Sequence, residues 1–180
     1  IKNYGHLVGG SLVHGHQQIG ATHTEPLRAR NNRVFFRREG RTVAAELIRQ
    51  ARGKGLILRE FSTGTLSVHP WMRRPYEMVY TVTDCSHSRL HHLATGELQD
   101  LADALSAGID IMMKILPRTG RQEAYNIVFN TGPSGSHDGL YVEFLPYTQE
   151  TGGFEHSGLY VCQGTPELCH SVIRSDILGP

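Results

Sequence analysis

The clearest pattern in the chain is a helical repeat of apolar residues between positions 95 and 117. Apolar side chains recur three or four positions apart, which places them on one face of a helix: Leu98, Leu101, Ala102, Leu105, Ile109, Met112, Met113 and Leu116. Thr95 can cap the start of this helix, Glu97 lies in its first turn, and Pro117 is expected to end it. We expect the stripe to face the core and not a cofactor.

Short runs rich in apolar, β-branched and aromatic residues predict the strands. They cover residues 11–19, 56–58, 76–82, 125–130, 140–145 and 158–161. Two further helices are predicted, one over residues 43–52 and one opened by Thr165 and Pro166. Strands, one long helix and then more strands with a closing helix are typical of an α+β fold with a mostly antiparallel sheet.

The composition indicates a folded domain. Of the 180 residues, 39% are hydrophobic and 19% are charged, which excludes a disordered chain. No apolar run approaches the roughly 20 residues that span a bilayer, so we expect no membrane partner. The cysteines Cys85, Cys162 and Cys169 are odd in number and lack a CxxC spacing, which predicts a reduced, cytoplasmic setting.

Arginines are concentrated between Arg28 and Arg41, although the net charge of the whole chain is only +1. Such a run could contact phosphates, including those of a nucleic acid. We interpret it instead as a solvated helix or connector and expect no nucleic-acid partner.

The segment from His14 to Gln18 carries the most specific chemistry in the chain. Two histidines separated by one residue on a strand point to the same side, about 6.5–7 Å apart. A neutral imidazole can attack phosphorus, and Gln18 can donate a hydrogen bond to a phosphoryl oxygen without adding charge. Ser11 and the N–H groups of Gly9 and Gly10 could form an anion-binding nest. Alone, the motif also fits a solvent-facing pair or a bare metal site.

The residues around the motif resemble the galactose-1-phosphate uridylyltransferase family of the histidine-triad superfamily. The matching residues are Asn3, Gly9, Gly10, Ser11, His14, His16, Gln18 and Ile19. Weaker landmarks continue through residues 125–128, 131–133, 143–146, 153–158 and 165–167. The resemblance implies a histidine-triad-like antiparallel sheet with one long helix. It assigns residues 1–27 to the end of a first repeat, 28–54 to a basic connector with a helix, and 55–180 to a second repeat.

The same resemblance implies the roles of the site residues. His16 would be the nucleophile that accepts the nucleotidyl group, and Gln18 would hold the phosphoryl oxygens. The substrate and its phosphates would contact a further set: Asn3, Gly9, Gly10, Ser11 and Gln163. His14 would bind zinc, whose other ligands in the family lie mostly in the first repeat.

A second metal is not expected. Some family members bind one through histidines of the second repeat, but the matching positions here carry Asn130, Gly139 and Tyr141, which leaves Glu143 as a single carboxylate. The histidines at 87, 91 and 92 beside Cys85 could suggest another metal site, but we interpret them as a solvated loop. We likewise assign His137 and Asp138 to turn chemistry.

The predicted activity is transfer of a nucleoside monophosphate between a nucleotide sugar and a sugar phosphate, carried out by a homodimer. The alternatives are a phosphorylase that splits a nucleotide sugar or dinucleoside polyphosphate, and a degenerate nucleotide-binding module without catalysis. Because the chain opens directly into the motif segment, we expect it to be part of a longer polypeptide. We expect the 180 residues alone to be inactive.

Overall fold

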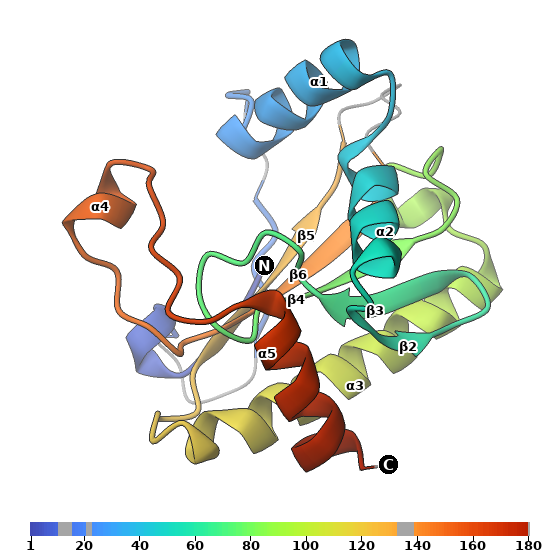
Figure 1. The fold of residues 1–180 in the computed structure, drawn as a ribbon. Helices are drawn as coiled ribbons and strands as arrows, with labels where there is room; N and C mark the ends of the chain where they lie inside the picture. The colour runs from blue at the N-terminus through green and yellow to red at the C-terminus, as the bar shows by residue number, and fades with distance from the viewer. Residues whose placement is uncertain (11–15, 21–22, 133–138, 180) are drawn as a thin grey trace.

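One six-stranded antiparallel sheet organises the chain, with strands in the order β1-β5-β6-β4-β3-β2 (Figure 1). The computed structural model describes residues 1–10, 16–20, 23–132 and 139–179. The strands are β1 (Lys2–Tyr4), β2 (Ile57–Glu60), β3 (Gly64–Val68), β4 (Met78–Val82), β5 (Tyr125–Asn130) and β6 (Tyr141–Pro146). The predicted α+β class and antiparallel sheet are therefore confirmed.

Helices lie on both faces of the sheet (Figure 1). The long helix α3 (Thr95–Arg118) packs on one face against apolar residues of β3, β4 and β6, among them Leu66, Tyr80 and Phe144. On the other face, Ala44 and Leu47 of α2 (Val43–Gly53) pack against the strand residues Val79 and Tyr141. Helix α1 (Leu27–Glu39) lies on the same side of the sheet as α2 and contacts it.

Helix α3 confirms the strongest prediction but corrects its details. Thr95 is the first helical residue and not the cap; Glu97 instead accepts the N–H of Ala94 at 2.8 Å. The predicted stripe does face the core: Leu101, Met112 and Leu116 are buried, and Leu105, Ile109 and Met113 pack against the core partly buried. Leu98 is 45% exposed, and the buried face also includes Ala104, Gly108, Ile111 and Ile115.

Gly108 lies where α3 approaches the sheet closely. A Cβ on Gly108 would lie 2.4 Å from the ring carbon Cε1 of Phe144, so only glycine allows α3 to approach β6 this closely. Small residues carry little weight in an apolar repeat, which is why the predicted stripe left out Ala104 and Gly108. Pro117 lies in the last turn, and the helix ends after Arg118. No helix in the described part of the chain is long and apolar enough to cross a bilayer.

The remaining elements are short. They are η1 (His6–Val8), η2 (Leu90–His92), α4 (Gly153–His156), α5 (Pro166–Val172) and the π-helical turn η3 (Ile173–Leu178). The strand predicted over residues 158–161 is wrong: this segment is an irregular connection whose Val161 carbonyl accepts a hydrogen bond from Gln149 Nε2 at 2.6 Å. An alternating run of apolar residues at a surface fits a strand by pattern, but here no neighbouring strand pairs with it among the described residues.

The first residues of the chain belong to the same sheet as the later ones. Strand β1 pairs with β5 through Lys2 and Ile127, and Gln17 pairs with Lys2 on the other side of β1. The division into two repeats stays a prediction. In space, residues 1–4 and the predicted second repeat share one sheet.

Candidate functional site

The described end of the motif, residues 16–18, lies beside β1 at the edge of the sheet. The amino terminus of Ile1 donates to the Gln18 carbonyl at 3.0 Å, and the Gln18 N–H donates to the Ile1 carbonyl at 2.9 Å. Because Gln17 pairs antiparallel with Lys2, the register places His16 opposite Asn3. His16 is half-buried and Gln18 is exposed. The predicted nucleophile and the predicted phosphate contact Asn3 are therefore neighbours across one strand pair.

A hydrogen-bonded amide pair fixes Asn3 in this position. Asn126 Nδ2 donates to Asn3 Oδ1 at 2.7 Å and to the Val8 carbonyl at 3.1 Å. Asn3 Nδ2 in turn approaches the Gly9 carbonyl at 3.5 Å. Asn126 on β5 thus holds both β1 and the loop that follows it, which gives the residue opposite His16 a defined orientation.

The glycine loop is closed on itself. The Gly9 N–H donates to the His6 carbonyl at 3.2 Å, and the Gly10 N–H donates to the Gly5 carbonyl at 3.0 Å. Gly9 has a φ of +83°, which favours glycine. Since both donors are used within the loop, the anion nest predicted from these two N–H groups is not formed in this conformation.

The other predicted contacts are placed only in part. Ser11 and His14 lie outside the described residues, as do His137 and Asp138. Gln163 is exposed, and its N–H donates to Gln149 Oε1 at 3.1 Å, which ties the segment before α5 to the end of the sheet.

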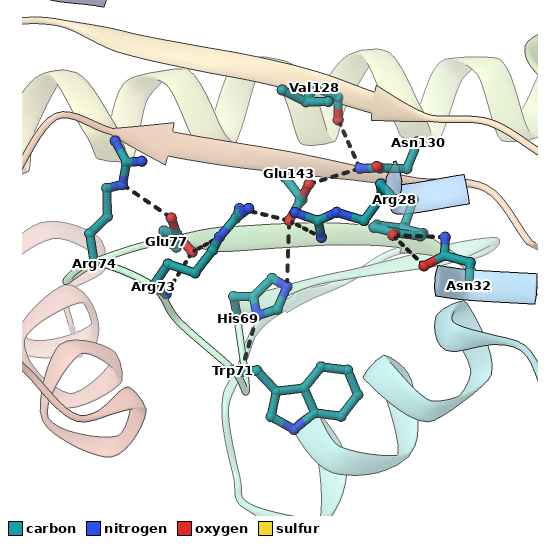
Figure 2. Close-up of polar contacts among 11 residues, drawn as sticks. Arg28, Asn32, His69, Trp71, Arg73, Arg74, Glu77, Val128, Asn130 and Glu143 are labelled. Carbon is teal, nitrogen blue, oxygen red and sulfur yellow. Dashed lines mark hydrogen bonds and ion pairs between the residues drawn. The ribbon is translucent and has the colours of Figure 1, made fainter. Parts of the chain in front are cut away.

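The second polar cluster of the described chain surrounds Glu143 on the buried inner part of β6 (Figure 2). Its Oε1 accepts from Arg28 Nη1 at 3.0 Å and from Arg73 Nη2 at 2.9 Å. Its Oε2 accepts from Asn130 Nδ2 at 3.0 Å. Burial alone would raise the pKa of Glu143, but Arg73 and Arg28 together outweigh it and hold the pKa below its usual range. The group is therefore a carboxylate.

Arg73 also joins a second buried carboxylate, Glu77. The backbone N–H of Arg73 donates to Glu77 Oε2 at 3.0 Å, and its side-chain Nε donates to the same oxygen at 3.4 Å. Arg74 Nε lies 3.3 Å from Glu77 Oε1 (Figure 2). These two carboxylates and the three arginines Arg28, Arg73 and Arg74 leave one positive charge in excess.

His69 lies beside this network and is only 4% exposed. Its Nδ1 accepts a hydrogen bond from the backbone N–H of Trp71 at 3.0 Å. A neutral His69 ring therefore carries its proton on Nε2. Nε2 is 3.8 Å from Glu143 Oε1, which is too long for a hydrogen bond. Burial lowers the pKa of His69 from 6.5 to about 4, so the ring is neutral at pH 7.

A cavity of about 570 Å³ opens above His69, Arg28 and Arg73, between α1 and the sheet. Its apolar walls include Phe35 and Trp71. Asn32, which also lines it, donates from Nδ2 to the Tyr141 hydroxyl at 3.1 Å.

The positions considered for a second metal lie partly in this cluster. Asn130 and Glu143 are hydrogen-bonded to each other, and Tyr141 lies on the same strand as Glu143. Gly139 is elsewhere, against Ala44 of α2. Among the described residues, no three His, Cys, Asp or Glu side chains are arranged to hold a metal ion. His87 instead pairs through Nδ1 with Glu97 at 2.9 Å.

The thiols show no sign of activation. Cys85, Cys162 and Cys169 are all unpaired by disulfides. Burial raises the pKa of each, and that of Cys169 reaches about 11. A thiolate nucleophile is therefore not favoured at any of the three positions.

Sequence reasoning did not single out His69 or Arg73, and it noted Arg28 only as part of a basic run. The available signal was an acidic residue, Glu143, inside an otherwise apolar strand. A carboxylate in such a position needs cationic partners, but nothing in the sequence shows that they come from α1 and from the β3–β4 connection.

The chain is similar to solved structures in its fold, whereas its sequence alone finds no match. No protein-family model matches the chain, and no curated protein matches it. A mutant uridylyltransferase is similar at a TM-score of 0.81 and 20% identity over 96% of this chain, and a second uridylyltransferase structure is similar at 0.80 and 22% over 95%. An ADP-glucose phosphorylase from Arabidopsis thaliana with bound ADP-glucose is similar at 0.77 and 21% over 97%.

The chain spans 60% of the first of these neighbours and 57% of the other two. At these identities the likeness establishes the fold. The fold predicted from the motif resemblance, that of the uridylyltransferase structures, is thereby confirmed.

Proposed function

We propose that the protein containing this chain transfers a nucleoside monophosphate from a nucleotide sugar to a sugar phosphate through a covalent nucleotidyl-histidine at His16. One observation carries the proposal: Gln17 and Gln18 of the His-x-His-x-Gln motif pair with Lys2 and Ile1, a register that puts His16 opposite Asn3, in a chain with the uridylyltransferase fold. The sequence motif supports this chemistry, and the fold is compatible with it.

The proposed reaction consists of two displacements at one phosphorus atom. A ring nitrogen of His16 attacks the α-phosphorus, a P–N bond forms, and the P–O bond to the departing sugar phosphate breaks. An oxygen of the acceptor sugar phosphate then attacks the same phosphorus and releases the imidazole. Gln18 donates a hydrogen bond to a phosphoryl oxygen in both steps. Asn3, held by Asn126, positions the substrate phosphate or the ring.

The other carried-over roles belong to the same proposal. Ser11, Gly9 and Gly10 would contact phosphate, which for the two glycines requires that the loop hydrogen bonds open. Gln163, exposed before α5, would contact the sugar phosphate.

Zinc enters the proposal only through His14, which lies outside the described residues. The described residues supply no set of three ligands for it, so no step of the proposed reaction depends on zinc. We also propose that Glu143 holds no second metal, because two guanidinium groups and one amide already occupy its oxygens and would repel a cation.

Isotope exchange tests the proposed reaction. The full-length protein is mixed with UDP-glucose or ADP-glucose and labelled glucose 1-phosphate, without any other acceptor. A covalent intermediate predicts label in the nucleotide sugar, and His16→Ala should abolish the exchange. Exchange that survives in His16→Ala would contradict the proposal.

The choice of acceptor separates the rival enzyme. One structural neighbour is an ADP-glucose phosphorylase, which makes inorganic phosphate the natural alternative to galactose 1-phosphate as acceptor. Faster turnover with inorganic phosphate would favour the phosphorylase. Nucleotide binding that is equal in wild type and His16→Ala, without any exchange, would favour a non-catalytic module.

We further propose a homodimer, as the family resemblance implies. Large apolar side chains are exposed around α4: Phe154 is 65% exposed, Leu159 is 62% and Val161 is 58%. Burying this surface in a second copy would remove it from water. Sedimentation should give twice the monomer mass for the full-length protein; a monomer at micromolar concentration would contradict this part.

A further inference from the structure

The cavity between α1 and the sheet has the size and composition of a ligand site, and the proposed reaction does not use it. Its volume of about 570 Å³ lies within the roughly 300–1,000 Å³ typical of small-molecule pockets. Leu27, Phe35, Val43 and Trp71 give it apolar walls, and Arg28, His69 and Arg73 contribute the polar groups. We propose that this cavity binds a small organic anion, with its carboxylate or phosphate group on Arg28, Arg73 and His69 and its apolar body against Trp71 and Phe35.

The charge balance selects an anion. Arg28 and Arg73 line the cavity. Together with Arg74 they pair with two carboxylates, Glu77 and Glu143, which leaves one positive charge in excess in this network. Arg28 donates one N–H to Glu143 and retains others, and its side chain is 40% exposed. A guanidinium group binds carboxylate or phosphate oxygens through two parallel N–H groups, so the excess charge also has suitable donors.

His69 supplies a donor that has no hydrogen-bond acceptor within the described residues. Trp71 fixes the proton on Nε2, and the closest acceptor, Glu143 Oε1, is 3.8 Å away and already takes hydrogen bonds from two arginines. The ring is 4% exposed and lines the cavity. An oxyanion in the cavity would accept a hydrogen bond from this N–H.

The rim favours a ligand with a planar or apolar body. Trp71 is 44% exposed although it is the largest apolar side chain in the chain, and it lies next to His69 (Figure 2). Tyr160, also at the cavity, has its ring 5.9 Å from the Arg73 guanidinium. An aromatic body can pack against such surfaces. A neutral ligand would leave the excess charge uncompensated, and a metal ion would be repelled by it.

Trp71 makes the test direct because it is the only tryptophan of the chain. The protein is titrated with phenyl phosphate, benzoate, inorganic phosphate and the neutral benzyl alcohol, while tryptophan emission is followed. We expect saturable binding of phenyl phosphate and benzoate, at least tenfold weaker binding of inorganic phosphate, and none of benzyl alcohol. If benzyl alcohol binds as tightly as phenyl phosphate, or if neither aromatic anion binds at millimolar concentration, the proposal is wrong.

Matched variants separate the roles. His69→Asn keeps an acceptor for the Trp71 N–H but removes the Nε2 donor, and should weaken phenyl phosphate about tenfold. Arg28→Gln should weaken it at least as much, whereas Arg33→Gln, on the same helix but paired with Glu25, should not. Circular dichroism checks that each variant folds. If His69→Asn does not fold, Arg28→Gln still tests the proposal, because Arg28 is partly exposed and its substitution should be tolerated. Unchanged affinity in Arg28→Gln would overturn the proposal.

This site is independent of the proposed nucleotidyl transfer. His16→Ala should leave the Trp71 response to phenyl phosphate unchanged. If the response is lost together with the exchange activity, the anion belongs to the reaction site and not to this cavity.

Discussion

Protonation of His69 should make the folded state lose stability between pH 7 and pH 5. Burial lowers the pKa of His69 from 6.5 to about 4. Glu143 opposes this shift, and Arg73 and Arg28 reinforce it. Because the folded-state pKa is depressed, the unfolded chain takes up a proton first as the pH falls. The contribution of His69 is therefore present above pH 6.5 and is lost as the pH falls from 6.5 towards 4.

The size of this loss follows from the shift. At about 1.4 kcal/mol per pKa unit, it amounts to about 2 kcal/mol at pH 5 relative to pH 7. The ring is 4% exposed, so solvent screening removes little of it.

Urea unfolding at a series of pH values measures this loss, in buffers free of phosphate and aromatic acids so that the cavity holds no anion. His69→Asn should flatten the curve by about 2 kcal/mol between pH 7 and pH 5, and His156→Asn, which removes an exposed histidine, should run parallel to wild type. If the His69→Asn curve is also parallel to wild type, His69 titrates alike in both states and the reasoning fails.

Three further substitutions test the packing. Gly108→Ala places a Cβ 2.4 Å from Phe144, and this overpacking should cost about 1–3 kcal/mol of unfolding free energy. Gly96→Ala, a control with open space around it in the same helix, should stabilise the protein by up to about 1 kcal/mol. Equal thermal unfolding of the two variants would refute the close approach of α3 to β6. Thr42→Ala removes the side chain that accepts the Ala45 N–H at 3.0 Å at the start of α2 and should cost about 1 kcal/mol in urea unfolding; no loss would mean that the cap is not formed. Glu143→Gln leaves Arg73 without a full counter-charge and should cost about 3 kcal/mol; wild-type stability would show that the network carries little energy.

The sequence predicted those elements whose pattern is local. Helix α3 and strand β5 were located correctly because an apolar helical repeat and a run of β-forming residues are visible without knowledge of neighbours. The predicted stripe of α3 left out Gly108, because its burial depends on meeting Phe144, a residue far away in the chain. Strand β1 was missed because three residues become a strand only by pairing with β5.

The two candidate sites likewise differ in how much of each can be predicted from a local stretch of sequence. The His16 motif is a local spacing and was visible at once, and its neighbour Asn3 was named with it. The cluster around Glu143 draws on α1, the β3–β4 connection, β5 and β6, so no single segment reveals it. The donors of Gly9 and Gly10 were assigned to an anion, whereas the folded loop uses them itself.

The central claim is that His16 forms a covalent bond to a nucleotide phosphorus. Mass spectrometry tests it most directly: the full-length protein is mixed with UDP-glucose, digested at neutral to basic pH because phosphoramidates are acid-labile, and the peptide carrying His16 is weighed. We expect a uridylyl adduct on that peptide, located on His16 by fragmentation, lost after addition of galactose 1-phosphate and absent from His16→Ala. An adduct on any other residue, or turnover with no adduct at His16, would contradict it.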